Sequence, residues 1–369
     1  MISVKEGEEL YIGLMSGTSM DGVDVALCVV NETECRLLAS LEHPFEASLK
    51  EEILLMISAD TSLRQVGVIN HRLGHVFANA VNALLQKQDI NPSQIKAIGS
   101  HGQTLWHSPE NEHAFSMQLG DANIIAVETG IDVVSDFRSK DVALGGEGAP
   151  FAPVFHQFLF HKPSQRIGVL NIGGMANLTV LGDEIVGFDT GPGNVLMDLW
   201  VQKQKAFWFD QDGSWAKAGK VDQPLLKTLL ADPYFKKKAP KSTGRELFNL
   251  QWLGKVLRNH RLVSAENVQA TLLEFTVETI LQEAEHYGVE QLMVCGGGVQ
   301  NSFLMERLAQ KQERISVSSS DEHGVDSSLM EAMLFGWLAY KRVHHETVAL
   351  SKVTGASRDA ILGGIYAAD

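Results

Sequence analysis

The sequence predicts an α/β fold in two domains, and three observations lead to this prediction. The chain has 369 residues, more than the roughly 250–300 residues at which a single hydrophobic core stops growing. Short apolar runs typical of buried strands alternate with segments whose apolar residues recur at helical spacing. A strand–turn–strand pattern with a glycine-rich turn occurs twice, at residues 11–30 and 167–181, which indicates two halves of related design.

Composition and charge exclude several classes of protein. Apolar residues make up 44% of the chain, as in a globular protein with a large core. The 31 basic and 45 acidic residues give a net charge of −14, which argues against broad binding to nucleic acid or to an anionic membrane. Three cysteines without C-x-x-C spacing predict no disulfide framework and no zinc site, and favour the reducing cytoplasm. We expect neither a signal peptide nor a membrane-spanning segment.

The first predicted domain comprises residues 1–135, with the tail from about 345 to 369 packing back on it. Its first element is a β-hairpin, in which an apolar run enters a polar turn at Ser16–Gly22 and a second run leaves it. Helices and further strands follow from the spacing of apolar residues. The expected elements are strands over 35–41, 95–100 and 131–138 and helices over 49–58 and 62–86.

The tip of the first hairpin is rich in glycine and hydroxyl residues. Glycine lets the backbone approach a ligand closely, and free N–H groups in such a turn form an anion-binding concavity. Asp21 and Asp24 could hold Mg²⁺ through water, because that ion keeps much of its hydration shell. The pattern therefore favours a phosphate-binding hairpin, although no Gly-Lys-Ser/Thr follows as in a Walker A loop. A plain polar hairpin turn is the alternative.

Two strand ends in this half carry polar side chains. The strand over 95–100 leads into His101, Gln103 and Thr104, where α/β folds often place ligand contacts. The strand over 131–138 ends in Arg138, which could bind a carboxylate or phosphoryl group or form an ion pair with Asp136 or Asp141. His101 could equally be a structural histidine. The glycine-rich segment 141–150 that follows is either a lid over a ligand or a linker.

The second predicted domain comprises residues 136–344. Asp189–Asn194 forms a tight turn after a short strand, and Gly296–Gly298 follows another strand and precedes a helix. Three glycines in such a turn would let a flat ligand such as adenosine lie on bare backbone. Lys241–Glu246 could reach the cleft or simply join two helices. The remaining expected elements are strands over 167–170, 178–181, 184–188 and 291–295 and helices over 153–160, 195–204, 268–287 and 327–340.

The order of three ligand-type turns, Ser16–Gly22, Asp189–Asn194 and Gly296–Asn301, matches an actin-like ATPase fold with its nucleotide cleft between two domains. Eight segments, in order over residues 11–356, further resemble the anhydro-N-acetylmuramic acid kinase family. The resemblance is specific in its first segment, and Met20 stands where leucine is common in relatives. These segments are 13–24, 100–104, 136–138, 146–150, 171–177, 188–194, 241–246 and 295–298.

This resemblance implies an ATP-dependent, Mg²⁺-requiring cytoplasmic kinase of the acetate and sugar kinase/Hsp70/actin fold. Such an enzyme opens 1,6-anhydro-N-acetylmuramic acid with water and phosphorylates O6 in peptidoglycan recycling. The family's homodimer is also expected. Asp189 matches the catalytic aspartate, with an Asx-turn as its structural alternative.

The remaining candidate residues fall into two groups. The expected sugar-binding residues are His101, Gln103, Thr104, Arg138 and Glu331, of which Glu331 could merely complement a helix dipole. The expected nucleotide-binding residues are Gly17, Thr18, Ser19, Met20, Asp21, Gly22, Val23, Asp24, Gly173, Asn177, Gly191, Gly193, Asn194, Gly296, Gly297 and Gly298, with Asp21 and Asp24 near the metal ion.

Two other functions remain open at the level of sequence. Another sugar or small-acid kinase of the same fold would share the nucleotide site and differ over residues 100–150. An ATP-switched chaperone or filament protein would bind nucleotide without turning over a sugar.

Overall fold

The computed structural model describes residues 7–17, 20–162 and 164–369. The chain divides into two compact units. Unit 1 contains residues 1–159 and 329–369, and unit 2 contains residues 160–328. In the part of the chain that the structure describes, no helix is long and apolar enough to cross a membrane.

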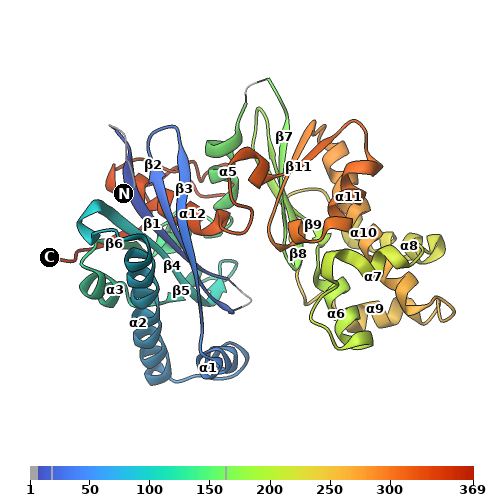
Figure 1. Ribbon diagram of the computed structural model, residues 1–369, viewed down its shortest axis with the longest axis horizontal. Helices are drawn as coiled ribbons and strands as arrows, with labels where there is room; N and C mark the ends of the chain where they lie inside the picture. The colour runs from blue at the N-terminus through green and yellow to red at the C-terminus, as the bar shows by residue number, and fades with distance from the viewer. Residues whose placement is uncertain (1–6, 18–19, 163) are drawn as a thin grey trace. The chain divides into compact units, whose positions relative to one another are not determined.

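Unit 1 is built on a mixed sheet (Figure 1). The strand β1 (Glu9–Ser16) lies at its centre, antiparallel to β2 (Gly22–Val30) on one side and parallel to β4 (Ile95–Ser108) on the other. The full order is β12-β6-β4-β1-β2-β3, and β5 pairs with the far end of β4. The remaining strands are β3 (Cys35–Pro44), β5 (Phe115–Leu119), β6 (Val133–Ser135) and β12 (Gly364–Tyr366).

Helices cover the sheet of unit 1. Leu10, Ile12 and Leu14 of β1 share one core with apolar residues of α2 (Leu63–Gln88), which begins with a capping box at Ser62. Tyr11 alternates to the other face and packs its ring against Tyr340 of α12 (Met330–Val343). The remaining helices of this unit are α1 (Ala47–Ser58), η1 (Pro92–Gln94), α3 (Ala122–Thr129), α4 (Phe137–Ala143) and α5 (Ala152–Phe160).

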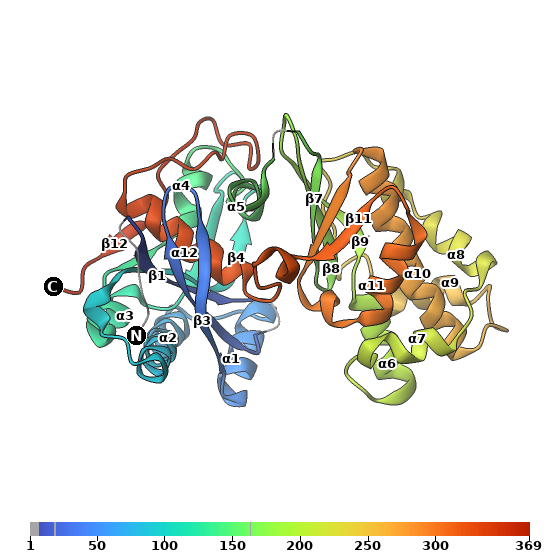
Figure 2. The ribbon, with the colours of Figure 1, turned by 45° about the horizontal axis from the view of Figure 1, so that its top comes forward.

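Helix α12 lies very close to the sheet because two strands carry glycine beneath it. A Cβ atom on Gly13 of β1 would lie 1.8 Å from the carbonyl oxygen of Ala332, and one on Gly99 of β4 would lie 1.9 Å from that of Phe335. No other residue type fits at such separations. The C-terminal helix is thus a built-in part of unit 1 (Figure 2).

Unit 2 has a five-stranded sheet in the order β11-β10-β7-β8-β9. Its central strand β7 (Ile167–Ile172) is antiparallel to β8 (Met175–Leu181) and parallel to β10 (Gln291–Cys295). The edge strands are β9 (Val186–Pro192) and β11 (Ser316–Ser319). The helices are α6 (Val195–Lys205), η2 (Gln211–Gly213), α7 (Ser214–Ala218), α8 (Gln223–Leu230), η3 (Pro233–Lys236), α9 (Leu250–Leu257), α10 (Ala265–His286), η4 (Gly297–Gln300), α11 (Ser302–Lys311) and η5 (Ser320–His323).

The two sheets have the same topology. In each, three antiparallel strands are followed by strands that run parallel to the first one, so β1, β2, β3, β4 and β6 correspond to β7, β8, β9, β10 and β11. The predicted two-domain α/β class is thus confirmed, and the repeated strand order supports two halves of related design.

The division into units differs from the predicted domain boundaries of 135/136 and 344/345. Segment 136–159 and helix α12 belong to unit 1. Phe137 of α4 packs against Phe335 of α12, and Phe155 of α5 packs against Trp337 of the same helix. These contacts between distant parts of the sequence are invisible to composition and spacing. The predicted strand over 131–138 is also shorter, because β6 ends at Ser135 and α4 begins at Phe137.

Candidate active site

Asp189 lies on β9 of unit 2, next to a β-bulge. Ala176 of β8 pairs with Gly191, whereas the next residue, Asn177, pairs with Asp189. Thr190 is therefore an extra residue in β9, and its hydroxyl donates to the carbonyl of Ala176 at 3.2 Å. Such bulges re-aim side chains and are frequent beside active sites. Here the bulge brings Asp189 opposite Asn177.

The carboxylate of Asp189 is held through one of its oxygens. Oδ2 accepts hydrogen bonds from the backbone N–H of Thr243 at 2.9 Å and from the Ser242 hydroxyl at 3.2 Å. No described residue donates to Oδ1. Both donors lie across the fold in residues 241–246, so the carboxylate does not close an Asx-turn. Segment 241–246 therefore does more than join two helices, because Ser242 and Thr243 contact Asp189.

Burial raises the pKa of Asp189 above the ordinary aspartate value, and the charge of Glu246 acts in the same direction. The hydrogen bonds from Thr243 and Ser242 oppose this rise. A carboxylate with a raised pKa is a better proton acceptor than an ordinary one. The hydroxyl of Thr243 is buried beside it and has no hydrogen-bond partner among the described residues.

The second glycine-rich hairpin joins β7 to β8 through Gly173 and Gly174. The backbone N–H groups of Gly193 and Asn194 donate to the carbonyls of Gly174 and Gly173, each at 2.9 Å. Gly193 and Asn194 are expected to bind the nucleotide, but their N–H groups are engaged within the protein. A Cβ atom on Gly193 would lie 2.4 Å from the Gly173 carbonyl oxygen, which explains that glycine by packing alone.

Arg245 brings positive charge to this hairpin. Its Nη2 lies 4.0 Å from the place where a Cβ atom on Gly174 would stand. The charge of Arg245 lowers the pKa of Asp198 on α6, although burial dominates and raises that pKa to about 6. Arg245 is not among the residues predicted from the sequence. The signal that could have found it is its place in segment 241–246, one of the segments that resemble the family.

The three glycines after β10 differ from one another. A Cβ atom on Gly296, which has φ +82°, would lie 2.1 Å from Asn171 Oδ1, and one on Gly298 would lie 2.4 Å from Ile172 Cγ2. Nothing lies within 4 Å of a Cβ atom on Gly297. Packing explains the outer two glycines, and the middle one borders open space. Likewise, a Cβ atom on Gly191 would lie 2.9 Å from the ring of Phe235.

In unit 1, the first hairpin is fastened to β4. The Ser16 hydroxyl lies 2.7 Å from Gln103 Oε1 and 2.9 Å from the Gly22 carbonyl oxygen. A Cβ atom on Gly22 would lie 2.3 Å from the carbonyl oxygen of His43, whereas Gly17 borders open space. Gln103, expected to bind sugar, is thus a buried link between the hairpin and β4.

The other residues expected at this hairpin have different environments. Met20 and Val23 are buried in the core of unit 1, so only their backbone could meet a ligand. Thr18 and Ser19 lie outside the described residues. Asp24 lies on β2 opposite Met15.

Asp21, one of the two proposed metal ligands, is exposed and already pairs with a lysine. The Asp21 side chain is 64% exposed and lies 2.6 Å from Lys50 Nζ, so a metal ion would share this carboxylate with a lysine. Within the described ranges, no group of three or more His, Cys, Asp or Glu residues is arranged to hold a metal ion. One exposed carboxylate fits Mg²⁺ that is bound mainly by water and by the phosphates of a nucleotide.

Arg138 and His101 form a second cluster in unit 1. Arg138 Nε and Nη2 lie 3.1 and 2.9 Å from His101 Nε2, and Nη1 donates to the Gly148 carbonyl at 3.0 Å. His101 Nδ1 lies 2.9 Å from the Gly102 carbonyl oxygen. Burial and the Arg138 charge lower the pKa of His101 to about 3, so the ring is neutral. His101 therefore positions Arg138, and both of its ring nitrogens are engaged inside the protein.

Arg138 forms no ion pair with Asp136 or Asp141, the alternative that the sequence left open. Burial lowers the pKa of its guanidinium, and the charge of Glu331 opposes this. Glu331 is reached by solvent, yet the surrounding protein raises its pKa, against the attraction of Arg138. The two side chains form an electrostatically coupled pair. Thr104 is partly exposed on the extended β4, which continues past the expected end at residue 100 to Ser108.

The glycine-rich segment after α4 is fastened to its surroundings. The buried Asp141 accepts from the Gly148 N–H at 2.7 Å and from the Thr354 hydroxyl at 2.7 Å. Arg138 holds the carbonyl of the same glycine, and the Glu147 N–H donates to the Thr354 carbonyl at 2.9 Å. These bonds fix the loop that holds Arg138.

Known proteins similar to this chain point to one family. Residues 9–368 match the model of the anhydro-N-acetylmuramic acid kinase family. The chain is 54% identical over 360 residues to the protein of that name from Sulfurovum sp. (strain NBC37-1), covering 97% of this chain and 99% of the relative. It is 51% identical over 365 residues to the protein of the same name from Sulfurimonas denitrificans, with 97% and 99% coverage. A solved structure, the activator of the 2-hydroxyisocaproyl-CoA dehydratase from Clostridium difficile with bound ADPNP, aligns with a TM-score of 0.46 and 10% identity, covering 91% and 96%.

Proposed function

The chain belongs to the anhydro-N-acetylmuramic acid kinase family, and we propose that Asp189 is the general base of the kinase reaction. The overall reaction converts 1,6-anhydro-N-acetylmuramic acid, ATP and water into N-acetylmuramic acid 6-phosphate and ADP. The single observation that supports the proposal is the asymmetric carboxylate of Asp189, which is held at Oδ2 and has no protein donor at Oδ1 within the described residues.

The proposed chemistry begins with a water molecule at Oδ1. Asp189 takes a proton from this water as its oxygen forms a bond to the anomeric carbon C1, and the C1–O6 bond breaks. O6 leaves with the electron pair and attacks the γ-phosphorus of ATP, so that ADP departs. No separate base is needed for O6, and the proton on Asp189 passes to solvent. The raised pKa of Asp189 suits a group that accepts a proton in this step.

Phosphoryl transfer requires positioning and charge neutralisation. In this proposal, the backbone around Gly17 and the β7–β8 turn meets the phosphates, and Gly297 borders the adenosine. Asn177, opposite Asp189, and Arg245, beside Gly174, supply polar and positive groups in unit 2. Mg²⁺ would be held by Asp21, with Asp24 nearby, and would neutralise phosphate charge when bound.

The sugar carries a lactyl carboxylate, and Arg138 is its proposed partner. His101 and the Gly148 carbonyl fix the guanidinium in one orientation, while N–H groups beyond those three contacts are available to a ligand. Thr104 and Glu331 would contact sugar hydroxyls. A homodimer in the cytoplasm completes the proposal, and sedimentation would test the dimer.

The test is an ADP-release assay with 1,6-anhydro-N-acetylmuramic acid, N-acetylmuramic acid and N-acetylglucosamine as alternative substrates, with products identified by mass. We expect turnover with the anhydro sugar alone and a product heavier by one phosphoryl group and one water. Turnover with an ordinary hexose would move the specificity to another sugar kinase. ATP binding without turnover of any sugar would contradict the proposal.

A further inference from the structure

Asp189 is fastened through its backbone as well as through its carboxylate. Its N–H donates to the carbonyl of Lys241 at 3.0 Å, and its own carbonyl accepts from the Tyr234 hydroxyl at 2.7 Å. The next two residues after Lys241 are the donors to Oδ2. Four hydrogen bonds therefore join Asp189 to residues 234–243, so the position of that segment decides where the carboxylate lies.

Lys241 is a buried cation that the proposed reaction does not use. Its side chain is 1% exposed, and Nζ lies 2.5 Å from Glu283 Oε1 on α10. The ammonium also lies over two aromatic rings, 5.1 Å from the centre of Tyr234 and 5.9 Å from that of Phe188, the neighbour of Asp189. Desolvating a charge is costly unless it is paired, and apolar groups often replace such pairs without loss of stability. A role other than stability would explain why the buried Lys241–Glu283 ion pair lies beside Asp189.

Resting on the proposed function of Asp189, we infer that Lys241 and Glu283 are positioning residues for the general base. The ion pair ties residues 241–243 to α10, a helix of 22 residues. The backbone of this segment then holds the N–H of Asp189, while Ser242 and Thr243 hold Oδ2 and leave Oδ1 for water. Tyr234 joins the same assembly, because its ring covers the ammonium and its hydroxyl holds the Asp189 carbonyl.

A charge effect and a positioning effect predict different results for the two partners. Lys241→Met removes a positive charge and Glu283→Gln removes a negative one, so a direct charge effect would move the pKa of Asp189 in opposite directions. Loss of position weakens the bonds from Ser242 and Thr243, which oppose the raised pKa of Asp189. Both variants would then raise that pKa further. The same direction for both variants is the signature of positioning.

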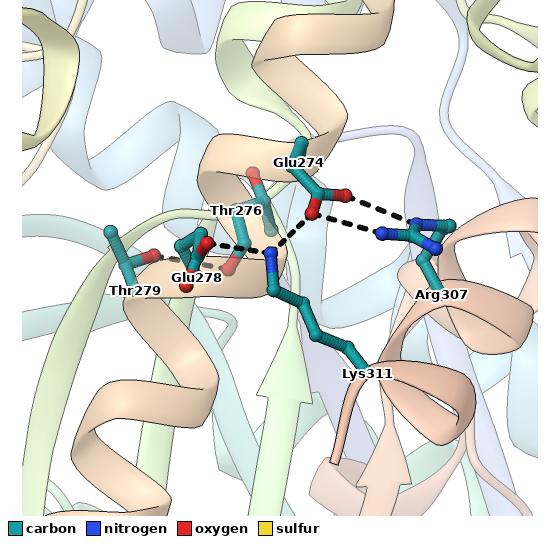
Figure 3. A network of polar contacts seen from close by, with 6 residues as sticks. All are labelled: Glu274, Thr276, Glu278, Thr279, Arg307 and Lys311. Carbon is teal, nitrogen blue, oxygen red and sulfur yellow. Dashed lines mark hydrogen bonds and ion pairs between the residues drawn. The ribbon is translucent and has the colours of Figure 1, made fainter. Parts of the chain in front are cut away.

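Another acidic residue on α10 supplies the matched control. Glu274 is buried and pairs with Arg307 and Lys311 of α11, and Lys311 also contacts Glu278 (Figure 3). This cluster fastens α10 to α11 and has no bond to residues 234–243. Glu274→Gln therefore removes a buried carboxylate from the same helix without releasing the segment that holds Asp189.

The experiment measures kcat, KM and the acid limb of kcat against pH for Lys241→Met, Glu283→Gln, Tyr234→Phe and Glu274→Gln. A carbon NMR titration of the Asp189 carboxyl, assigned with Asp189→Asn, supplies a readout without turnover. For the first two variants we expect kcat to fall about 10- to 100-fold, as when a reacting group is misplaced by about 1 Å, with KM changed little. Tyr234→Phe should show a smaller loss in the same direction.

Two outcomes overturn the inference. In one, Lys241→Met and Glu283→Gln lower the melting temperature but leave kcat and the Asp189 pKa as in the wild type and in Glu274→Gln. In the other, the two variants move the Asp189 pKa in opposite directions. A wild type that does not turn over the anhydro sugar would instead contradict the proposed function, and the NMR titration would still decide whether the ion pair positions Asp189.

Discussion

Strands β4 and β10 have the same place in the two sheets, yet they end in opposite ways. Each runs parallel to the central strand of its unit. β4 continues through His101, Gln103 and Thr104 to residue 108, whereas β10 stops at Cys295 and is followed by three glycines. One strand end presents side chains and the other presents backbone. The comparison teaches that one topology can end in side chains in unit 1 and in bare backbone in unit 2, as the proposed sugar and nucleotide contacts require.

The third strands of the two sheets, β3 and β9, also differ at their acidic residues. Asp24 of β2 pairs with Glu42 of β3, and Asn177 of β8 pairs with Asp189 of β9. The third strand of each sheet thus carries an acidic residue opposite a polar residue of the second strand. The bulge of β9 at Thr190 directly follows Asp189, whereas the register shift of β3 lies at Leu38, away from Glu42. Asp189 accepts hydrogen bonds from a distant segment, whereas Glu42 is exposed. The neighbouring bulge and the hydrogen-bond donors, rather than the strand order, distinguish Asp189 from a surface carboxylate.

The largest expected effect is a difference in kcat between variants of the two carboxylates, Asp189 and Glu42. Asp189→Asn should lower kcat by about 10³-fold, because removal of a general base typically costs 10²–10⁴, while calorimetry should find ATP binding retained. Glu42→Gln, on the third strand of unit 1, is the control and should retain wild-type kcat. A kcat for Asp189→Asn within tenfold of the wild type would show that Asp189 is not the base.

A smaller effect distinguishes glycines required by packing from a glycine that borders the ligand. Gly298→Ala places a Cβ atom 2.4 Å from Ile172 Cγ2 and should lower the free energy of unfolding by about 1–3 kcal/mol, the usual cost of overpacking. Gly297→Val has open space around it, so the melting temperature should stay the same while the Kd of ATP rises, by roughly tenfold for about 1.4 kcal/mol. Equal ATP affinity in Gly297→Val and the wild type would contradict the bare-backbone interpretation of β10.

The smallest expected effect at neutral pH is on folding stability, and it comes from His101 on β4. The pKa of His101 lies near 3 in the folded protein and near 6.5 in the unfolded chain. Between these values the unfolded chain binds a proton that the folded one does not, so stability falls as the pH falls from 6.5 towards 3, with a slope of about 1.4 kcal/mol per pH unit.

Chemical denaturation at several pH values would measure this slope. His156, also buried and with its pKa lowered to about 3, adds a second contribution of the same sign. His107, whose pKa burial and the Arg138 charge also lower, contributes with the same sign. His101→Gln should remove only the contribution of His101, and the dependence of stability on pH near pH 7 should stay as in the wild type. An unchanged slope in His101→Gln would mean that His101 is protonated in the folded state.

The sequence was a good guide where signals are local. Neighbouring residues predict the long periodicity of α2 and the hairpin that joins β1 to β2. The predicted turn at Asp189–Asn194 is wrong in its first part, because β9 continues past residue 188 through Asp189 to Pro192. The bulge at Thr190, the contact of Ser242 and Thr243 with Asp189, and the pairing of Lys241 with Glu283 depend on residues far apart in the sequence. Spacing carries no information on such contacts.

Glycine shows the same limit in another form. Gly296, Gly297 and Gly298 are indistinguishable in the sequence, and we expected all three to meet the nucleotide. The structure explains two of them by Asn171 and Ile172, which follow one another at the end of β7. Only coordinates separate a glycine that avoids a protein neighbour from one that leaves room for a ligand.

The close packing of α12 on Gly13 and Gly99 has a consequence for folding during synthesis. Synthesis proceeds from the N-terminus, and domains generally fold as units during it. The strands β1, β2 and β4 emerge first, but the helix that covers the Tyr11 and Gly13 face of their sheet is encoded after the whole of unit 2. Unit 2 is continuous in sequence and can close around its own core as soon as it leaves the ribosome. The first strands to be translated must therefore wait for almost the last helix, and the half of the protein made second is the half able to fold first.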